Sequence, residues 1–330
     1  MKSIIIMKPF KKLRRNRRLL MAYYVDSQYY NNPRIKLHNW VGNPTPQDFW
    51  IPRFLEHKEL TMGKRISIFS VFGLRYMMRI DRGDVKIFVA RENVHRSNWS
   101  EYDDLCLGEK CLDLSVGFDY HIDDERYIRL PLWVMWLFQP DVTYKGIKDF
   151  CDRVNNPDNS SYADRKFCSF ITSHCDIGRT ELFEEINSIG KIDSAGRFMH
   201  NCDDLQQLYD DDKLKFLKRY RFNLCPENSD CEGYCTEKVF EAISSGCVPI
   251  YWGSENKPEP NVLNPDAICF VKVGEKNPRE TLDKIKRLNE NEKDYDEFSH
   301  QPRLLPDAPD VIMQYIIDFE NKLRYIIKNS

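Results

Sequence analysis

Between residues 221 and 253 the chain carries polar and charged side chains whose spacing suits phosphate binding. The stretch reads RFNLCPENSDCEGYCTEKVFEAISSGCVPIYWG. A strand-like run leads into a polar loop that ends at Thr236, a residue type that often precedes a helix. The predicted helix starts with Glu237 and Lys238. Lys238 could give a point charge to a phosphate, Glu237 could accept hydrogen bonds from ribose hydroxyls, and the free N–H groups of a helix N-terminus favour anions.

The same stretch is also consistent with an ordinary strand–helix–strand unit that binds nothing. The preference of helix N-caps for threonine explains Thr236, and an acid in the first turn, as at Glu237, complements the helix dipole. Such units are common, and a fold does not dictate a function. The residues by themselves leave both interpretations open.

The order of the motifs resembles the donor-binding signature of the α-1,3/4-fucosyltransferases, glycosyltransferase family 10, of bacterial or viral type. The matching segments are FNLCPENS, GYCTEKVFEA and GCVPIYWGS. Pro226 departs from the family pattern, in which Phe or another apolar residue commonly stands there. The resemblance implies GDP-fucose as the donor substrate. The donor-binding residues that it implies in this segment are Glu227, Asn228, Ser229, Tyr234, Glu237 and Lys238.

A weaker match extends the resemblance upstream. KFCSFITSHCDIGRTELFEEIN, residues 166–187, is similar to a strand and helix start of the family. Arg179 matches the arginine that grips the donor pyrophosphate, a task that suits a bidentate guanidinium. Ser173-His174 stands where the family usually has Ser-Asn. The resemblance implies Arg197 as a second pyrophosphate contact.

The first half of the chain matches the family in FVARENVHRSN, residues 88–98, and in the segments LSVGFDY and ERYIRLPLW. Glu92 falls on the proposed general base of the family, with Arg91 in place of the usual Gly. The resemblance implies an inverting transfer of L-fucose, in which Glu92 takes the proton of an acceptor hydroxyl as GDP leaves. That hydroxyl is expected to be O3 of GlcNAc or glucose in a glycan acceptor.

Two other functions stay open. One is a transferase of the same architecture that uses another nucleotide sugar, and the other is a catalytically silent glycan-binding protein on the same fold. The presence of Glu92, Arg179, Glu237 and Lys238 together favours an enzyme, because a binding protein needs no proton acceptor.

No obligatory metal is expected. The acidic pairs Asp103-Asp104 and Asp203-Asp204 and the run 210–212 follow no predicted strand cleanly, so they are predicted to be solvated. Positive side chains would replace the metal, although Mn2+ or Mg2+ could stimulate the reaction. Cys231 and Cys235 lack the tighter paired spacing of zinc ligands.

The elements that must position these residues alternate between strand and helix. In the first half, strands are expected over 19–26, 65–72, 85–90 and 112–118, with a helix over 47–59 and a core helix over 132–138 that packs on the first sheet. In the second half, strands are expected over 166–172, 220–225, 248–252 and 267–271, and helices over 179–189, 236–245, 280–288 and 311–327. This alternation predicts parallel sheets, which bind ligands outside the carboxyl ends of their strands.

The predicted fold class is therefore α/β, with two Rossmann-like domains facing a cleft, as in GT-B-type glycosyltransferases. The polar segment 155–163 marks the domain boundary. We expect an N-terminal acceptor-binding domain over 1–155 and a GDP-sugar-binding domain over 156–310. A C-terminal helix over 311–330 is expected to pack back on the N-terminal domain.

The amino-acid composition limits which classes of partner and which cellular setting are expected. The 330 residues include 49 basic and 51 acidic side chains, and this near-neutral balance disfavours nucleic acid. The 11 cysteines are odd in number and no secretory signal is visible, so free thiols in the cytoplasm are expected. The basic run over 8–18 is either a solvated tail or a peripheral contact with the inner face of a membrane. The apolar run 4–7 is too short to span a bilayer.

Overall fold

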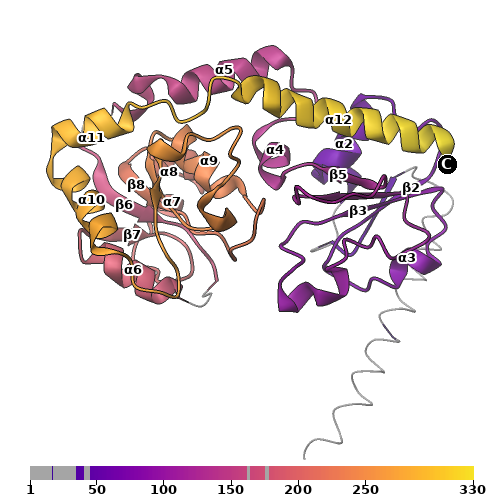
Figure 1. Ribbon diagram of the computed structural model, residues 1–330, viewed down its shortest axis with the longest axis horizontal. Coiled ribbons are helices and arrows are strands. Elements are labelled where there is room, and N and C mark those ends of the chain that lie inside the picture. The colour runs from indigo at the N-terminus through magenta and orange to yellow at the C-terminus, as the bar shows by residue number, and fades with distance from the viewer. Residues whose placement is uncertain (1–16, 18–34, 41–44, 162–163, 175–177) are drawn as a thin grey trace, which may run out of the picture. The chain divides into compact units, whose positions relative to one another are not determined.

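The computed structural model describes residues 17, 35–40, 45–161, 164–174 and 178–330. The strand predicted over 19–26 and the basic run, except for Arg17, lie outside these residues. The described chain forms two compact units. Unit 1 holds the residues up to 117 together with 121–130 and 317–330, and unit 2 holds 118–120 and 131–316. These bounds differ from the predicted domain ranges, and helix α12 (Ala308–Asn329) begins in unit 2 and ends in unit 1 (Figure 1).

Unit 1 is built on a five-stranded sheet in which every neighbouring pair is parallel. The strands follow the chain in the order β1 (Ile35–His38), β2 (Ile66–Phe69), β3 (Val85–Val89), β4 (Leu114–Gly117) and β5 (Tyr127–Arg129). Strands β2 and β4 are buried along their whole length, as expected of parallel strands covered on both faces.

The helices of unit 1 are α2 (Trp50–His57), α3 (Met77–Ile80) and the end of α12, with short 3-10 segments at Pro46–Asp48 and Ser97–Tyr102. Aromatic rings join α2 to α12. The rings of Trp50 and Phe54 stack 4.7 Å apart, and Phe319 lies 5.5 Å from Phe54. The helix predicted over 47–59 is thus present, and its apolar face is buried.

Unit 2 is built on a second five-stranded parallel sheet, in the order β10-β9-β8-β6-β7. Its strands are β6 (Lys166–Phe170), β7 (Ile192–Ser194), β8 (Tyr220–Leu224), β9 (Val248–Tyr251) and β10 (Cys269–Phe270). The chain leaves β6 for β7 on one side and returns as β8 on the other. This reversal creates a switch point between β6 and β8, where open α/β sheets bind ligands.

The helices of unit 2 flank its sheet, and four of them lie between its strands along the chain (Figure 1). They are α4 (Leu132–Leu137), α5 (Tyr144–Asn155), α6 (Arg179–Asn187), α7 (Asp204–Gln207), α8 (Lys213–Leu217), α9 (Glu237–Ser244), α10 (Arg279–Glu290) and α11 (Glu292–Ser299), with 3-10 segments at Pro157–Ser160, Ser254–Asn256 and Pro265–Ala267. Apolar side chains of α6 and α10 join the core of the sheet. The predicted α/β class with two parallel sheets is confirmed.

One packing prediction is wrong. The apolar helix at 132–138, α4, was expected on the first sheet, but it belongs to unit 2. The ring of Trp133 stacks on Phe240 of α9 with centroids 4.1 Å apart, while Trp136 is 57% exposed. Apolar content reveals that a helix is buried, but it does not reveal which partner buries it.

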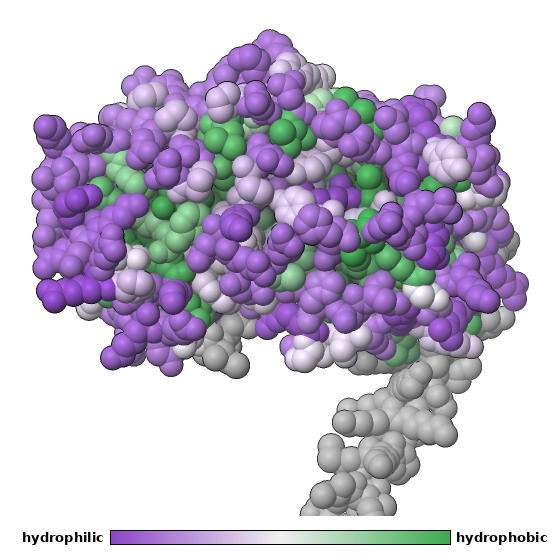
Figure 2. Space-filling model, viewed as in Figure 1, coloured by the Kyte–Doolittle hydropathy of each residue, from purple (hydrophilic) through white to green (hydrophobic). Residues whose placement is uncertain are grey.

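Six cysteines that are free thiols, as expected from the sequence, are buried: Cys106, Cys151, Cys168, Cys225, Cys247 and Cys269. Burial raises the pKa of Cys151 and of Cys247 to about 12, so these thiols stay protonated. The face seen in Figure 2 is largely hydrophilic, with apolar side chains in small patches. In the described part of the chain, no helix is both long and apolar enough to cross a membrane.

Candidate functional site

Most of the predicted donor-binding residues gather at the carboxyl ends of β6 and β8, beside the N-terminus of α9. The chain beyond β8 continues to pair with β9: Cys225 donates its N–H to the Ile250 carbonyl at 2.9 Å, and Glu227 donates to the Trp252 carbonyl at 2.8 Å. The ladder therefore holds the start of the loop rigidly against the sheet. Asn228 and Ser229, the next residues, are half-buried.

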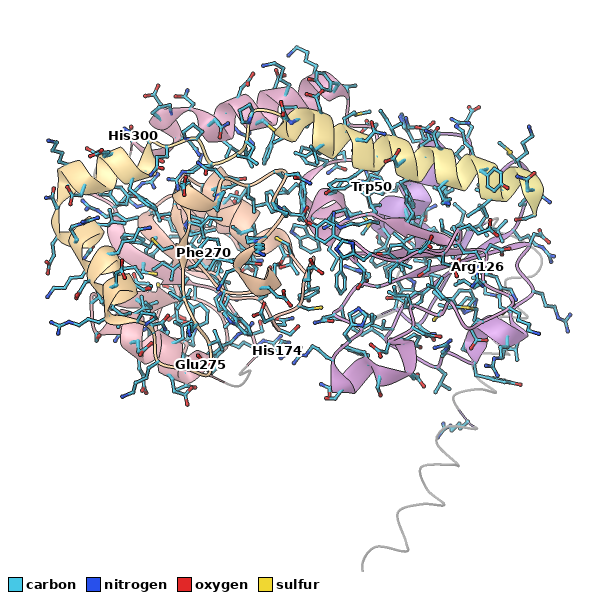
Figure 3. All side chains as sticks on the ribbon, viewed as in Figure 1. Trp50, Arg126, His174, Phe270, Glu275 and His300 are labelled. Carbon is cyan, nitrogen blue, oxygen red and sulfur yellow. The ribbon has the colours of Figure 1, made fainter. Side chains whose placement is uncertain are left out.

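Arg179 joins the two strand ends. It is the first residue of α6 and only 1% exposed. Its Nη1 donates to Thr172 Oγ1 and to the His174 carbonyl, both at 3.0 Å. Its Nη2 donates to three groups of the loop after β8: the carbonyl of Pro226 at 3.3 Å, the carbonyl of Glu227 at 2.8 Å and Asn228 Oδ1 at 3.0 Å. The guanidinium thus ties the end of β6, near His174 in Figure 3, to the loop after β8.

Glu227 lies at the centre of a buried cluster. Its side chain is 0% exposed, and Lys238 Nζ donates to its Oε2 at 2.6 Å. Thr236 donates its N–H to Oε1 at 2.8 Å, and its hydroxyl lies 3.0 and 2.8 Å from the two carboxylate oxygens. The Tyr251 hydroxyl completes the shell at 3.5 Å from Oε1. Protein groups therefore surround both oxygens of this carboxylate.

Lys238 is the cation of this cluster that reaches the surface, because 20% of its side chain is exposed. Burial lowers the pKa of Lys238, but the charges of Glu227 and Glu237 and the hydrogen bond to Glu227 outweigh burial and leave the pKa above its ordinary value. Lys238 is therefore charged at neutral pH. Glu237, its half-buried neighbour, starts α9.

The N-terminus of α9 is open. Thr236 occupies the N-cap position as predicted, but its side chain does not cap the helix. Its hydroxyl donates to Glu227 instead. Within the described chain, the N–H groups of Glu237, Lys238 and Val239 find no hydrogen-bond partner. Such groups and the helix dipole form a ready site for an anion.

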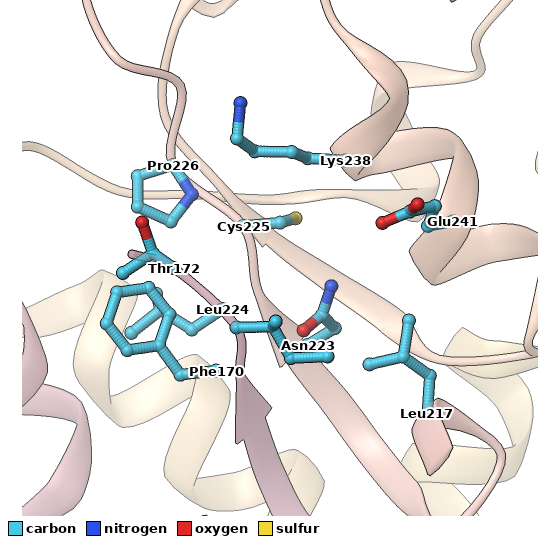
Figure 4. Close-up of a pocket in the computed structure, with 10 residues that line it drawn as sticks. Phe170, Thr172, Leu217, Asn223, Leu224, Cys225, Pro226, Lys238 and Glu241 are labelled. Atoms are coloured by element: carbon cyan, nitrogen blue, oxygen red, sulfur yellow. The ribbon is translucent and has the colours of Figure 1, made fainter. Parts of the chain in front are cut away.

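A small pocket opens behind Lys238, between the strand ends and α9 (Figure 4). Its volume of about 20 Å3 suffices for one water molecule, so it is not a nucleotide cavity in this form. Glu241 lines it one turn after Glu237 and lies 3.5 Å from Lys213 Nζ. Burial raises the pKa of Glu241 above its ordinary value, although Lys213 opposes this effect.

Two further donor-site predictions have different surroundings. Tyr234 is 2% exposed, packs edge-on against Phe118 at 5.1 Å, and accepts a hydrogen bond on its carbonyl from Ser254 Oγ at 2.6 Å. Arg197 lies exposed beyond the edge strand β7, and no hydrogen bond or ion pair joins it to other described residues. The structure does not bring Arg197 into the cluster around Lys238.

Glu92 lies in unit 1, three residues beyond the end of β3, and is half-buried. The predicted base and the predicted donor residues therefore come from different units. Arg91 beside it has its guanidinium 5.1 Å from the ring of Trp40 and 5.2 Å from that of Phe49. Aromatic contacts thus position the residue at which this chain departs from the family pattern.

Sequence reasoning missed the residues that support the cluster from β9. Tyr251 and Ser254 share a hydrogen bond of 3.2 Å, and Gly253 has a φ of 137°. The following turn, Ser254–Asn256, has positive φ at all three residues. These residues belong to the motif VPIYWGS, but the motif alone does not identify Glu227 as their partner.

The acidic runs serve as ion pairs and caps. Asp104 pairs with Arg75 at 2.5 Å, Asp204 with Lys166 at 3.3 Å, and Asp212 accepts the Lys215 N–H of α8 at 3.0 Å. In the ranges that the structure describes, no group of three or more His, Cys, Asp or Glu side chains could hold a metal ion.

Two family models match the chain in sequence. Residues 162–302 match glycosyltransferase family 10 (fucosyltransferase) C-term, and residues 35–136 match the alpha-(1,3)-fucosyltransferase FucT N-terminal domain. The first covers the site of unit 2, and the second covers Glu92 and most of unit 1.

Curated relatives carry related names. Alpha-(1,3)-fucosyltransferase FucT of Helicobacter pylori is 32% identical over 56% of this chain and 42% of its own length. Alpha-(1,3)-fucosyltransferase B of Drosophila melanogaster is 31% identical over 52% of this chain and 40% of its own length. GDP-fucose protein O-fucosyltransferase 3 of Xenopus tropicalis is 34% identical over 39% of this chain and 29% of its own length. The match thus spans about two fifths of the first two relatives.

Solved structures share the fold. A crystal structure of alpha1,3-fucosyltransferase covers 88% of this chain and 89% of its own, with a TM-score of 0.58 at 21% identity. A structure of alpha1,3-fucosyltransferase with GDP-fucose covers the same shares with a TM-score of 0.56 at 22% identity. At this identity the likeness establishes the GT-B-type fold alone. Because both family models match in their N-terminal to C-terminal order, the chain belongs to glycosyltransferase family 10, the fucosyltransferases.

Proposed function

We propose that this protein is an enzyme that transfers L-fucose from GDP-fucose to a hydroxyl of a glycan acceptor, with inversion. The observation that carries the proposal is the open N-terminus of α9 beside the charged Lys238, at the switch point between β6 and β8. A diphosphate there would meet unpaired N–H groups, the helix dipole and an ammonium.

The same groups would serve the chemistry. When the bond between fucose and GDP breaks, negative charge grows on the departing diphosphate, and fixed donors aimed at that charge stabilise the transition state. Lys238 and the first turn of α9 would supply these donors. Arg179 would hold the two loops in place, and its predicted direct contact with the pyrophosphate stays part of the proposal. Glu237, one residue before Lys238, would accept hydrogen bonds from the ribose hydroxyls. Asn228 lies at the same edge of the sheet.

On the acceptor side, Glu92 would act as the general base. It follows a strand of a parallel sheet, as catalytic groups of open α/β folds often do, and an inverting transfer needs a carboxylate near the attacking hydroxyl. We propose that residues 1–155 bind the acceptor, that 156–310 bind the GDP-sugar and that 311–330 pack on the N-terminal part. O3 of GlcNAc or glucose is the proposed acceptor atom.

The setting of the protein is also part of the proposal. We propose a cytoplasmic enzyme whose basic run over 8–18 contacts the inner face of a membrane, where each basic residue adds about 1 kcal/mol of attraction to anionic lipid. Mn2+ or Mg2+ would stimulate the reaction without being required, because Lys238 and the helix N-terminus supply positive charge.

The test is isothermal titration of the purified protein with GDP-fucose, GDP-mannose and UDP-glucose, alongside Lys238→Ala. GDP compounds should bind, UDP-glucose should bind much more weakly, and the substitution should weaken GDP binding at least tenfold, since a charge-assisted contact is worth about 1.5–3 kcal/mol. A preference for UDP-glucose would favour a transferase with another nucleotide sugar. GDP-fucose binding without transfer to any acceptor glycan would favour a catalytically silent binding protein.

A further inference from the structure

Glu227 is placed among the donor-binding residues by its motif, but its surroundings give it another role. The Glu227 carboxylate is 0% exposed. A carboxylate accepts about four hydrogen bonds. Thr236 N–H, the Thr236 hydroxyl, Lys238 Nζ and the Tyr251 hydroxyl already surround it.

The contacts of Glu227 determine how Thr236 can act. The Thr236 hydroxyl points its proton at Glu227, and Lys238 Nζ donates to the same hydroxyl oxygen at 2.9 Å. A threonine at this position ordinarily turns its oxygen toward the N–H groups of the first helical turn and caps them. Here the hydroxyl is engaged on the other side, so the N–H groups of the first turn of α9 stay available.

The same contacts determine where Lys238 lies. Lysine has a flexible stem of four carbons, and ordering such a side chain costs about 0.5–1.5 kcal/mol on binding. Two of its three protons already point to Glu227 and Thr236, which fixes the direction of the third. A donor that met this lysine would not have to order it.

We infer that Glu227 is a positioning residue, which holds Thr236 away from the N-terminus of α9 and aims Lys238, so that a diphosphate meets a prepared site. The inference rests on the proposed function. The charge of Glu227 by itself would repel a phosphate, and therefore the residue can favour binding only through Lys238 and Thr236. This condition makes the inference testable.

The experiment measures GDP and guanosine affinity by isothermal titration for the wild type, Glu227→Gln, Lys238→Ala and the double variant. Gln keeps the shape but removes the charge and replaces one acceptor oxygen by an N–H2 group, which faces a donor in either orientation. We expect Glu227→Gln to weaken GDP binding about tenfold and guanosine binding less than twofold, because guanosine has no phosphate. In the Lys238→Ala background the same change should weaken GDP binding clearly less than in the wild type, because only the route through Thr236 is left.

Asp193→Asn is the matched control. Asp193 is also a buried carboxylate paired with lysines, on β7 of the same sheet, so its loss has a comparable structural effect away from α9. It should leave the GDP to guanosine affinity ratio unchanged. The inference is overturned if Glu227→Gln weakens GDP binding equally in both backgrounds, weakens guanosine as much as GDP, or does not weaken GDP in the wild type. Absence of GDP binding by the wild type would instead overturn the proposed function.

Discussion

Gly253 is the residue at which backbone conformation and the buried cluster meet. Its φ of 137° and ψ of 174° lie in a region that essentially only glycine adopts. A Cβ atom there would lie 2.7 Å from Glu227 Cγ and 2.8 Å from Glu227 Cβ. Gly253 therefore permits the turn after β9 and also leaves room for Glu227.

Gly253→Ala should lower the free energy of unfolding of unit 2 by about 2–3 kcal/mol or more and should weaken GDP binding, because strain and collision add. Gly274→Ala separates the two effects. Gly274 has a φ of 80°, but a Cβ there meets no atom within 4 Å, so only about 1–2 kcal/mol of strain is expected. Urea unfolding measures the loss in free energy of unfolding for each variant. Equal losses would contradict a collision between the added Cβ at position 253 and Glu227.

Glu241 makes stability depend on pH. Its pKa is raised in the folded protein by burial, so folding favours the protonated form. Its contribution is fully present below the ordinary carboxyl pKa and is lost as pH rises through the raised pKa. The stability of Glu241→Gln relative to the wild type should thus increase between pH 4 and pH 7. Urea unfolding of both proteins across this range measures the difference, and a flat difference would count against a raised pKa.

At the scale of elements, the packing of α4 on α9 connects an apolar helix to the site. Trp133 is 0% exposed and lies against Phe240, on the helix whose N-terminus carries Lys238. Trp136, three residues further along α4, is 57% exposed. Helix α4 therefore carries one buried and one exposed tryptophan, so the effects of substituting each can be compared directly.

Trp133→Ala should lower the free energy of unfolding by about 3–5 kcal/mol, because it removes a large buried ring from a packed interface. Trp136→Ala should change it by less than about 0.5 kcal/mol, as exposed substitutions usually do. Chemical denaturation followed by circular dichroism provides the comparison. Similar effects of the two substitutions would mean that α4 does not pack on α9 in solution.

At the scale of the whole molecule, the predicted base and the donor cluster belong to different compact units. Binding of the donor and transfer of the sugar should then be separable. A substitution in unit 1 can abolish the reaction while unit 2 still binds GDP.

Glu92→Gln should lower the turnover number for fucose transfer by about 100- to 10,000-fold, the usual value of a general base, and should leave the GDP dissociation constant within twofold of the wild type. Glu56→Gln, an exposed carboxylate on α2 of the same unit, should change neither quantity. A transfer assay with GDP-fucose and a GlcNAc-containing acceptor, together with titration of GDP, measures both. Full activity of Glu92→Gln would remove Glu92 from the mechanism.

The sequence by itself determined the α/β class, the family and the order of most strands and several long helices, whereas helix α5 and strand β1 were not predicted. Hydrophobic runs such as 85–90 and 220–225 predict strands because burial on both faces leaves a continuous apolar pattern, and the donor motif extends over more than thirty residues in order. The strands β5 and β7 have only three residues each, too few for a pattern, and were not predicted.

Only the tertiary structure decided what each polar residue of the motif does. The sequence places Glu227, Thr236 and Lys238 close together. It does not show which hydrogen bonds they form with each other and with Tyr251. Nor could spacing reveal that Arg179 would be buried between two strand ends. Local sequence sets backbone propensity and residue chemistry, whereas hydrogen-bond partners depend on which distant strands the fold places side by side.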